Sequence, residues 1–229
     1  MTFLLKLTSL CNAGVLLEYA GCCLLVDGIA QDFRGFDGLS APLFQEILRR
    51  DGPYAALSGV FFTHCHPDHF DKTRAEQLRT ALPACPFFIP DERTLPCGSI
   101  QCGPFSVSYY ETPHMPQDFA QVRHFVLLVT AGIESVYLAA DAVLDAGLHR
   151  CILQQTRPDY IFVNPVYLAV PDTRQLLEEL LPKRLFVYHI PSDQSDRNRM
   201  RRKAQRSAER YRDTLPPTTL TGAYPMRLL

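Results

Sequence analysis

One short segment of the sequence constrains the fold more than any other. Residues His64–His69, with the sequence HCHPDH, directly follow the apolar run Gly59–Phe62, which is typical of a buried strand. Three imidazoles and a carboxylate so close together would compete for hydrogen-bond partners when neutral and would repel one another when protonated. A divalent cation removes that conflict, because neutral His and ionised Asp are its natural ligands. The segment therefore predicts a metal site at the end of a strand.

This segment holds more ligands than one tetrahedral ion can use. His64 and His66 would serve one metal ion, and Asp68 and His69 would serve a second ion beside it. Two ions about 3.5–4 Å apart need further ligands from elsewhere in the chain. The candidates are acids at strand ends and the remaining histidines, His114, His124, His149 and His189.

The pattern HCHPDH resembles the H-x-H-x-D-H motif of the metallo-β-lactamase superfamily. The family's remaining metal positions have matches in the expected order at His114, Asp141 and His189, each of which follows a strand-like run. The match extends from residue 3 to residue 190. The resemblance implies a four-layer αββα sandwich, with a dinuclear metal site at one edge of its two sheets.

The same resemblance implies how the ligands are shared between the two ions. One metal is expected to bind His64, His66 and His114, and the other Asp68, His69 and His189, with Asp141 bridging them. Taken alone, His189 could be a structural residue and Asp141 a helix cap. His124 and His149 are needed by neither ion and are interpreted as structural, and Cys65 is expected to face away from its histidine neighbours.

The rest of the sequence predicts an α+β fold and a single domain over residues 1–229. Two apolar runs, 15–19 and 22–26, flank Ala20-Gly21, which is typical of a β-hairpin turn. Helices are expected over residues 42–50, 71–82, 142–155, 173–181 and 193–211. Further strands are expected over residues 3–7, 59–63, 87–89, 105–110, 125–129, 135–139, 160–163 and 185–188.

Composition and the N-terminal segment suggest the compartment of the protein. The chain has 229 residues, 47% of them hydrophobic, which is enough for a sizeable core. Its 8 cysteines show no zinc-finger spacing, and the sequence has neither a signal-peptide pattern nor an apolar run long enough to span a membrane. We therefore expect a cytoplasmic protein with reduced thiols and no membrane partner. The sequence leaves the oligomeric state open.

The near-neutral net charge of −1 hides an uneven distribution. The segment 197–212 carries eight basic residues and one acid, which leaves 15 basic and 23 acidic residues in the rest of the chain. Such a segment is typically a solvated helix, here packing through Met200, Ala204 and Ala208. It could also face an anionic substrate, an RNA or an acidic partner. Ser192, Asp193 and Arg197 follow His189 closely, so the start of this helix could border the metal site.

We expect a dimetal-dependent hydrolase that uses a metal-bridging hydroxide to cleave an ester, lactone, thioester or phosphodiester bond in a small, possibly anionic substrate. The ions are expected to be zinc, with manganese or iron as alternatives. The resemblance implies that Asp68 also orients the attacking hydroxide. Asp27 would either support a ligand histidine or simply form a turn. The loops 29–39 and 90–103 are expected to set substrate specificity.

The resemblance also disfavours other chemistries. True β-lactamases of the superfamily lack the bridging Asp that Asp141 provides, and the diiron oxygen- and nitric-oxide-reducing branch has Glu where His66 stands. The chain is too short for the extra domain of nucleic-acid-processing members. Two alternatives stay open: a nuclease or phosphodiesterase guided by the basic C-terminal helix, and a non-catalytic module that binds metal or nucleic acid.

Overall fold

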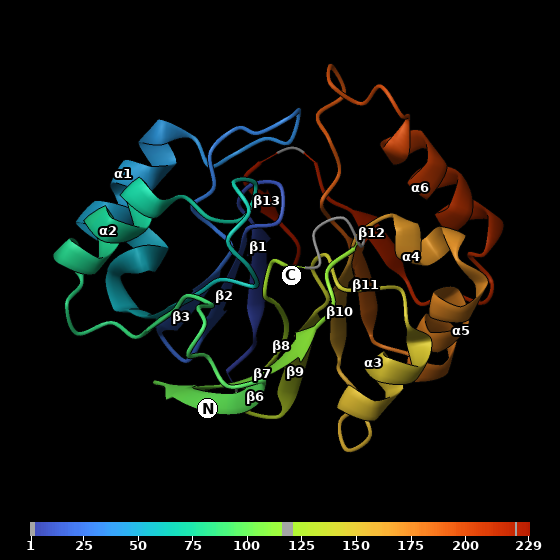
Figure 1. Ribbon diagram of the computed structural model, residues 1–229, viewed down its shortest axis with the longest axis horizontal. Coiled ribbons are helices and arrows are strands. Elements are labelled where there is room, and N and C mark those ends of the chain that lie inside the picture. The colour runs from blue at the N-terminus through green and yellow to red at the C-terminus, as the bar shows by residue number, and fades with distance from the viewer. Residues whose placement is uncertain (1–2, 116–120, 223) are drawn as a thin grey trace.

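The computed structural model describes residues 3–115, 121–222 and 224–229. Two β-sheets lie face to face at the centre of the molecule, and helices cover the outer side of each (Figure 1). Helices α1 (Ala41–Arg49) and α2 (Lys72–Ala81) lie on one side. The opposite side carries α3 (Ala146–Ile152), α4 (Val166–Ala169), α5 (Pro171–Leu180) and α6 (Met200–Arg210). This arrangement confirms the expected α+β class and its four αββα layers.

The first sheet has the strand order β13-β1-β2-β3-β4-β5. Its strands are β1 (Lys6–Ser9), β2 (Val15–Tyr19), β3 (Cys22–Val26), β4 (Leu57–Phe61), β5 (Phe87–Phe88) and β13 (Met226–Arg227). Strands β1, β2 and β3 pair antiparallel, and β4 and β5 extend the sheet in parallel. The predicted hairpin turn is present, with Ala20 and Gly21 both at positive φ, as two-residue hairpin loops require. The short 3-10 helix Gly52–Ala56 leads into β4.

The second sheet has the strand order β12-β11-β10-β9-β8-β7-β6. Its strands are β6 (Cys97–Cys102), β7 (Phe105–Thr112), β8 (His124–Ala131), β9 (Glu134–Leu138), β10 (Tyr160–Val163), β11 (Arg184–Val187) and β12 (Thr218–Leu220). Strands β6 to β9 form an antiparallel meander, and β9 to β12 pair in parallel.

Three apolar clusters hold the four layers together. The central cluster lies between the sheets and includes Phe61, Phe105 and Phe162, all fully buried. A second cluster, with Ile47, packs the first sheet against α1 and α2, and a third, with Leu177, packs the second sheet against its helices. Each sheet therefore buries apolar side chains on both faces, which explains why its central strands are continuous apolar runs.

Two helices are shorter than the sequence predicts, and in both an aspartate carboxylate accepts hydrogen bonds from backbone amides of the first turn. Helix α3 starts at Ala146 rather than at residue 142, because Asp145 accepts a hydrogen bond from Leu148 N and Ala142 pairs with His114 instead. Helix α6 starts at Met200 rather than at residue 193, because the Asp196 carboxylate accepts from the first free backbone amides.

The sequence did not predict strands β6, β12 and β13 or the single-turn helix α4. These elements are two to six residues long, and three of them are only partly buried or exposed, so they show no clear hydrophobic period. Among the described residues, no helix is long and apolar enough to cross a membrane.

Candidate metal centre

The candidate ligands lie where several strands end at one edge of the sandwich. Strands β7, β9 and β11 run in the same direction, because β8 lies antiparallel between β7 and β9 while β9, β10 and β11 are parallel. The residues His114, Asp141 and His189 follow these three strands. The loop after β4 reaches the same edge from the first sheet, where Phe125 N donates a hydrogen bond to Thr63 O at 2.8 Å.

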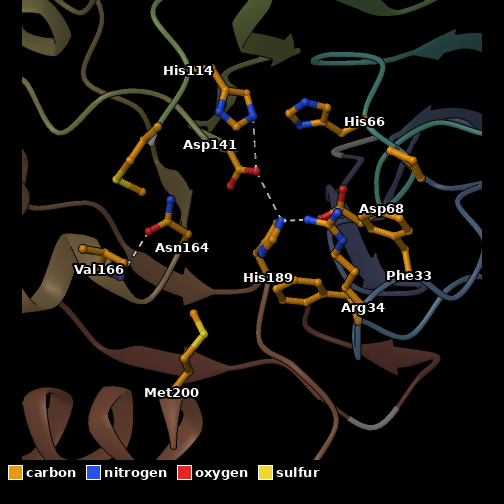
Figure 2. Close-up of a pocket in the computed structure, with 13 residues that line it drawn as sticks. Phe33, Arg34, His66, Asp68, His114, Asp141, Asn164, Val166, His189 and Met200 are labelled. Carbon is orange, nitrogen blue, oxygen red and sulfur yellow. Dashed lines mark hydrogen bonds and ion pairs between the residues drawn. The ribbon is translucent and has the colours of Figure 1, made fainter. Parts of the chain in front are cut away.

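The structure brings all seven expected ligands together in two groups. The first group is His64, His66 and His114, and the second is Asp68, His69, Asp141 and His189. Within each group, the atoms that could bind a metal lie within 4.8 Å of one another. His64 Nε2 and His114 Nε2 are 3.2 Å apart, and His189 Nε2 is 3.2 Å from Asp68 Oδ2. Figure 2 shows His66, His114, Asp68 and His189 converging around Asp141.

Asp141 occupies the position between the two groups. Its Oδ2 atom lies 3.7 Å from His114 Nε2 and 3.8 Å from His64 Nε2 in the first group. The same oxygen lies 3.3 Å from His189 Nε2 and 3.5 Å from His69 Nε2 in the second group. A carboxylate oxygen within 3.8 Å of imidazoles from both groups fits the bridging role that the family resemblance implies for Asp141.

Asp27 orients two of the ligand imidazoles from behind. Its Oδ2 atom accepts hydrogen bonds from His69 Nδ1 at 2.9 Å and from Thr63 Oγ1 at 2.7 Å. Thr63 Oγ1 in turn accepts from His64 Nδ1 at 3.1 Å. With both Nδ1 atoms donating, the Nε2 atoms of His64 and His69 are left facing the site. The structure thus favours the supporting role of Asp27 over that of a plain turn former.

The backbone around Asp141 is held by residues that the sequence does not single out. Asp141 N donates to His124 Nε2 at 3.1 Å, so His124 carries its proton on Nδ1, which donates to Thr112 Oγ1 at 2.9 Å. On the preceding residue, Ala140 N donates to Tyr188 Oη and Ala140 O accepts from Asn164 Nδ2. His124 lies outside both ligand groups, as expected, but it positions a ligand.

Strained backbone marks the same region. Asp27, Ala140 and His189 all have positive φ, between 47° and 56°, although none of them is glycine. Such a conformation costs about 1 kcal/mol or more and persists only where the surroundings enforce it. His189 is a candidate ligand, Asp27 accepts a hydrogen bond from the candidate ligand His69, and Ala140 directly precedes Asp141. The strained conformations therefore occur where the backbone positions candidate ligands.

The electrostatics of the two groups differ. Burial lowers the pKa of His64 well below its usual value and that of His114 to about 4, so both imidazoles are neutral. Burial also opposes protonation of His189, but Asp141 and Asp68 outweigh it and raise the His189 pKa to about 9. Burial disfavours ionised Asp68 as well, yet the hydrogen bond with His189 lowers the Asp68 pKa to about 2.

These donors fit divalent cations. The first group offers three imidazoles, and the second offers imidazoles together with carboxylates, a donor set that suits zinc, manganese and iron. His69 Nε2 is buried and has no hydrogen-bond partner among the described residues. The neighbouring Cys65 thiol donates instead to Pro90 O at 3.6 Å, in keeping with its expected orientation away from the ligands.

An open cavity of about 320 Å³ reaches the ligands from solvent. Five of the seven candidate ligands line it: His66, Asp68, His114, Asp141 and His189. The loop residues Phe33, Arg34 and Phe36 line it as well, whereas no residue of the loop 90–103 does. Of the two loops expected to set specificity, the first therefore faces this cavity.

Solved structures resemble this fold over nearly the whole chain. The possible metal-dependent hydrolase from Veillonella parvula DSM 2008 has a TM-score of 0.70 at 15% identity, over 97% of this chain and 98% of its own. The metallo-β-lactamase fold protein YhfI from Bacillus subtilis has a TM-score of 0.65 at 15% identity, over 97% of both chains. The diiron β-hydroxylase CmlA from Streptomyces venezuelae has a TM-score of 0.65 at 14% identity, over 100% of this chain and 54% of its own.

No protein-family model and no curated protein sequence matches the chain. The relationship is therefore carried by the arrangement of the elements in space rather than by overall sequence identity. On that arrangement, the chain has the metallo-β-lactamase fold.

Proposed function

We propose that this chain is a dimetal-dependent hydrolase that cleaves an ester, lactone, thioester or phosphodiester bond in a small substrate. One observation carries the proposal: the seven candidate ligands gather in two adjoining groups, and five of them line an open cavity. Structural metal sites are closed by protein ligands, whereas catalytic sites keep a position open to substrate. The arrangement therefore supports catalysis over a purely structural site.

Two cations held by these donors would activate a water molecule near neutral pH and polarise the substrate oxygen. The ligand residues supply the geometry for this chemistry. His64, His66 and His114 would hold one ion, and Asp68, His69 and His189 the other, with Asp141 between them. The carboxylate of Asp68 also lines the cavity, so it can orient an attacking water by accepting its hydrogen bond.

The fold by itself does not select hydrolysis, because it occurs both in a possible metal-dependent hydrolase and in a diiron β-hydroxylase. The family resemblance implies Glu in place of His66 in the diiron oxygen- and nitric-oxide-reducing branch, so His66 argues against that redox chemistry and in favour of hydrolysis. Zinc is the ion we propose, with manganese and iron as the alternatives, since imidazole and carboxylate ligands accept all three.

A nuclease guided by helix α6 is the weaker alternative. The first residue of the helix, Met200, lines the cavity, so a long substrate could reach the basic segment. Arg201, however, is engaged by Asp193 at 2.9 Å and by Thr221 O at 2.9 Å. The exposed Arg202 and Arg206 remain available for a polyanion.

The proposal is tested with protein loaded separately with zinc, manganese and iron(II). Each form is assayed against bis(p-nitrophenyl) phosphate, p-nitrophenyl acetate, a γ-lactone, an acyl thioester and a single-stranded oligonucleotide. We expect turnover of at least one small substrate. His66→Ala should lower kcat/KM about a thousandfold or more, because it removes a candidate metal ligand. His66 is half-buried, so this change leaves the core intact.

The control is Arg206→Gln, an exposed change on α6 that should leave small-substrate turnover unaltered and should weaken only cleavage of a polyanion. A protein that binds two metals but turns over none of these substrates would contradict the hydrolase proposal. So would a His66→Ala variant that retains full activity with an unchanged metal content.

A further inference from the structure

The cavity beside the candidate ligands has two chemically different walls. One wall is the polar surface of ligand side chains. The other, the apolar wall, consists of lining side chains from four separate segments, namely Phe33, Phe36, Met115, Val166 and Met200. In Figure 2, Phe33 lies on one side of His189, and Val166 and Met200 lie on the other. A volume of about 320 Å³ is at the lower end of ligand pockets.

Apart from the candidate ligands, two polar side chains among the described residues line this cavity. Asn164 is already engaged, because its Nδ2 donates to Ala140 O at 3.1 Å and its Oδ1 accepts from Val166 N at 3.0 Å. Arg34 is exposed, and it makes no hydrogen bond or ion pair with any residue that the structure describes. Its guanidinium lies 5.0 Å from the centre of the Phe33 ring. Of these two side chains, Arg34 is thus the one that is free to bind an anionic group of a ligand.

Arg34 is presented by a tight hairpin that is strained in its own right. Phe33 and Phe36 exchange backbone hydrogen bonds of 3.1 and 2.9 Å around Arg34 and Gly35. Both central residues have positive φ, 48° and 94° respectively. Two-residue turns of this kind favour Asn, Asp or Gly at the first central position, so an arginine there is costly. A side chain that is present despite this conformational free-energy cost points to a functional role for that side chain.

The tip of this hairpin is anchored to the segment that follows His189. Ser192 N donates to Gly35 O at 3.0 Å, and the Phe36 ring packs edge-on against the His189 ring with centroids 4.4 Å apart. A Cβ atom on Gly35 would lie 2.6 Å from Ser195 Cβ, so the close docking requires glycine. The hairpin is therefore a fixed platform that holds Arg34 at the cavity.

We propose that this cavity selects substrates that combine a small apolar group with a separate negative charge, and that Arg34 binds that charge. The apolar group packs against the wall formed by Phe33, Phe36, Met115, Val166 and Met200. A guanidinium remains charged at all working pH values and pairs in a directed way with carboxylates and phosphates. The inference rests on the proposed function only for the identity of the reacting bond; binding by the cavity can be measured without hydrolysis.

The test uses two fluorescent probes that differ by one charge, 1-anilinonaphthalene-8-sulfonate and the neutral N-phenyl-1-naphthylamine. Both are titrated into metal-free protein, so that no metal ion binds the anion. We expect Arg34→Gln to weaken binding of the sulfonate about tenfold and to leave binding of the neutral probe unchanged, as loss of one charge-assisted contact predicts. Arg34→Lys should retain most of the affinity.

Arg206→Gln is the matched control, since it removes the same charge from an exposed position on α6. Competition with phenylacetate and with phenyl phosphate then assigns the preferred anion as carboxylate or phosphate. Equal sulfonate affinity in the two glutamine variants would overturn the inference, as would an equal loss for the neutral probe.

Failure of the inference can be told apart from failure of the proposed function. If sulfonate binding depends on Arg34 while no substrate is hydrolysed, the hydrolase proposal is wrong and the cavity still selects apolar anions. If hydrolysis depends on His66 while both probes bind independently of Arg34, the hydrolase proposal stands and the substrate inference is wrong. Urea unfolding of each variant verifies that the fold is retained.

Discussion

Asp27 shows how much of the site depends on one carboxylate that cannot itself reach a metal ion. It is 1% exposed, and its two oxygens accept from Thr63 N, Thr63 Oγ1 and His69 Nδ1. Through Thr63 it also orients His64. One side chain therefore sets the ring orientation and the tautomer of one ligand in each group.

Replacing Asp27 with Asn should weaken metal binding without removing any ligand. The amide would present hydrogens where Thr63 Oγ1 or His69 Nδ1 now donates, so at least one of these contacts is lost. Supporting partners of this kind contribute about 10–100-fold to metal affinity. We expect a loss of that size in titrations against a chromogenic chelator, and no loss for Asp51→Asn, which removes an exposed carboxylate paired with Arg49. Unchanged affinity in Asp27→Asn would contradict this role.

His124 was predicted to be structural, and the structure shows the specific role that the sequence did not indicate. It is fully buried and contacts a candidate ligand through the Asp141 backbone rather than through a metal-binding position. Its place depends on the register of β7 and β8, which sets His124 opposite Thr112. No local sequence pattern indicates how β7 pairs with β8. A polar residue at the start of a strongly apolar strand was the one available signal.

At the scale of elements, a hydrogen-bond relay joins α3 and α4 to the segment after β9. Tyr137 Oη donates to His149 Nδ1 at 2.6 Å, and His149 Nε2 donates toward Tyr167 Oη at 2.8 Å and Val143 O at 3.1 Å. Tyr167 Oη in turn donates to Ala142 O at 3.4 Å. The relay provides hydrogen-bond donors to Ala142 O and Val143 O, the carbonyls that directly follow Asp141. It requires the His149 imidazole to be neutral, because His149 Nδ1 accepts a hydrogen bond from Tyr137.

This relay predicts a pH dependence of stability. Burial lowers the His149 pKa, with Val143 O and Asp145 opposing the effect, so the unfolded chain takes up a proton more readily than the folded protein does. The contribution of His149 to stability is therefore constant above about pH 7.5 and is lost as the pH falls below about 6.5, by up to about 1.4 kcal/mol per pH unit.

The variant His149→Gln should show a shallower loss of stability below pH 6.5, because it has no proton to take up. At pH 8 it should be less stable than the natural protein, since it breaks the relay. Urea unfolding between pH 5 and 8 in the presence of chelator measures both effects. The candidate metal ligands titrate alike in the two proteins, so their contribution cancels in the difference. Parallel stability curves would show that His149 does not titrate in this range.

At the scale of the whole molecule, the candidate ligands come from both sheets. His64–His69 follow β4 of the first sheet, and His114, Asp141 and His189 follow strands of the second. Metal ions bound by both sets would therefore join the two halves of the sandwich. Any ligand that binds only the folded state stabilises it by mass action.

Chelation should accordingly lower the thermal midpoint of unfolding. With free metal at a thousand times its dissociation constant, one site contributes about 4 kcal/mol of stability. We expect EDTA to lower the midpoint of the natural protein clearly, and to lower that of His66→Ala by less, because one ion has lost a ligand. Scanning calorimetry with and without EDTA measures the difference. An identical midpoint in both conditions would show that metal does not stabilise the fold.

The sequence alone determined the chemistry and the general architecture. A strand followed by HCHPDH predicted a metal site at His64, His66, Asp68 and His69, and the family resemblance added His114, Asp141 and His189, all of which the structure gathers. Strand and helix periods predicted the α+β class, because burial on one face or on both leaves a local pattern; the four layers came from the resemblance. The predicted starts of α3 and α6 were wrong, since Asp145 and Asp196, inside the predicted helices, bind the first-turn amides of the shorter helices.

Tertiary structure alone decided what surrounds those ligands. The positioning of Asp141 by His124, Asn164 and Tyr188 depends on strand register and on side chains distant in sequence. The apolar wall and the anchoring of the Arg34 hairpin likewise join segments more than 100 residues apart. Ligand chemistry is a property of residue types at short spacing, which a sequence displays. A cavity is formed by side chains that come together only after the chain has folded. Its shape, and the position of Arg34 beside it, therefore required the tertiary structure.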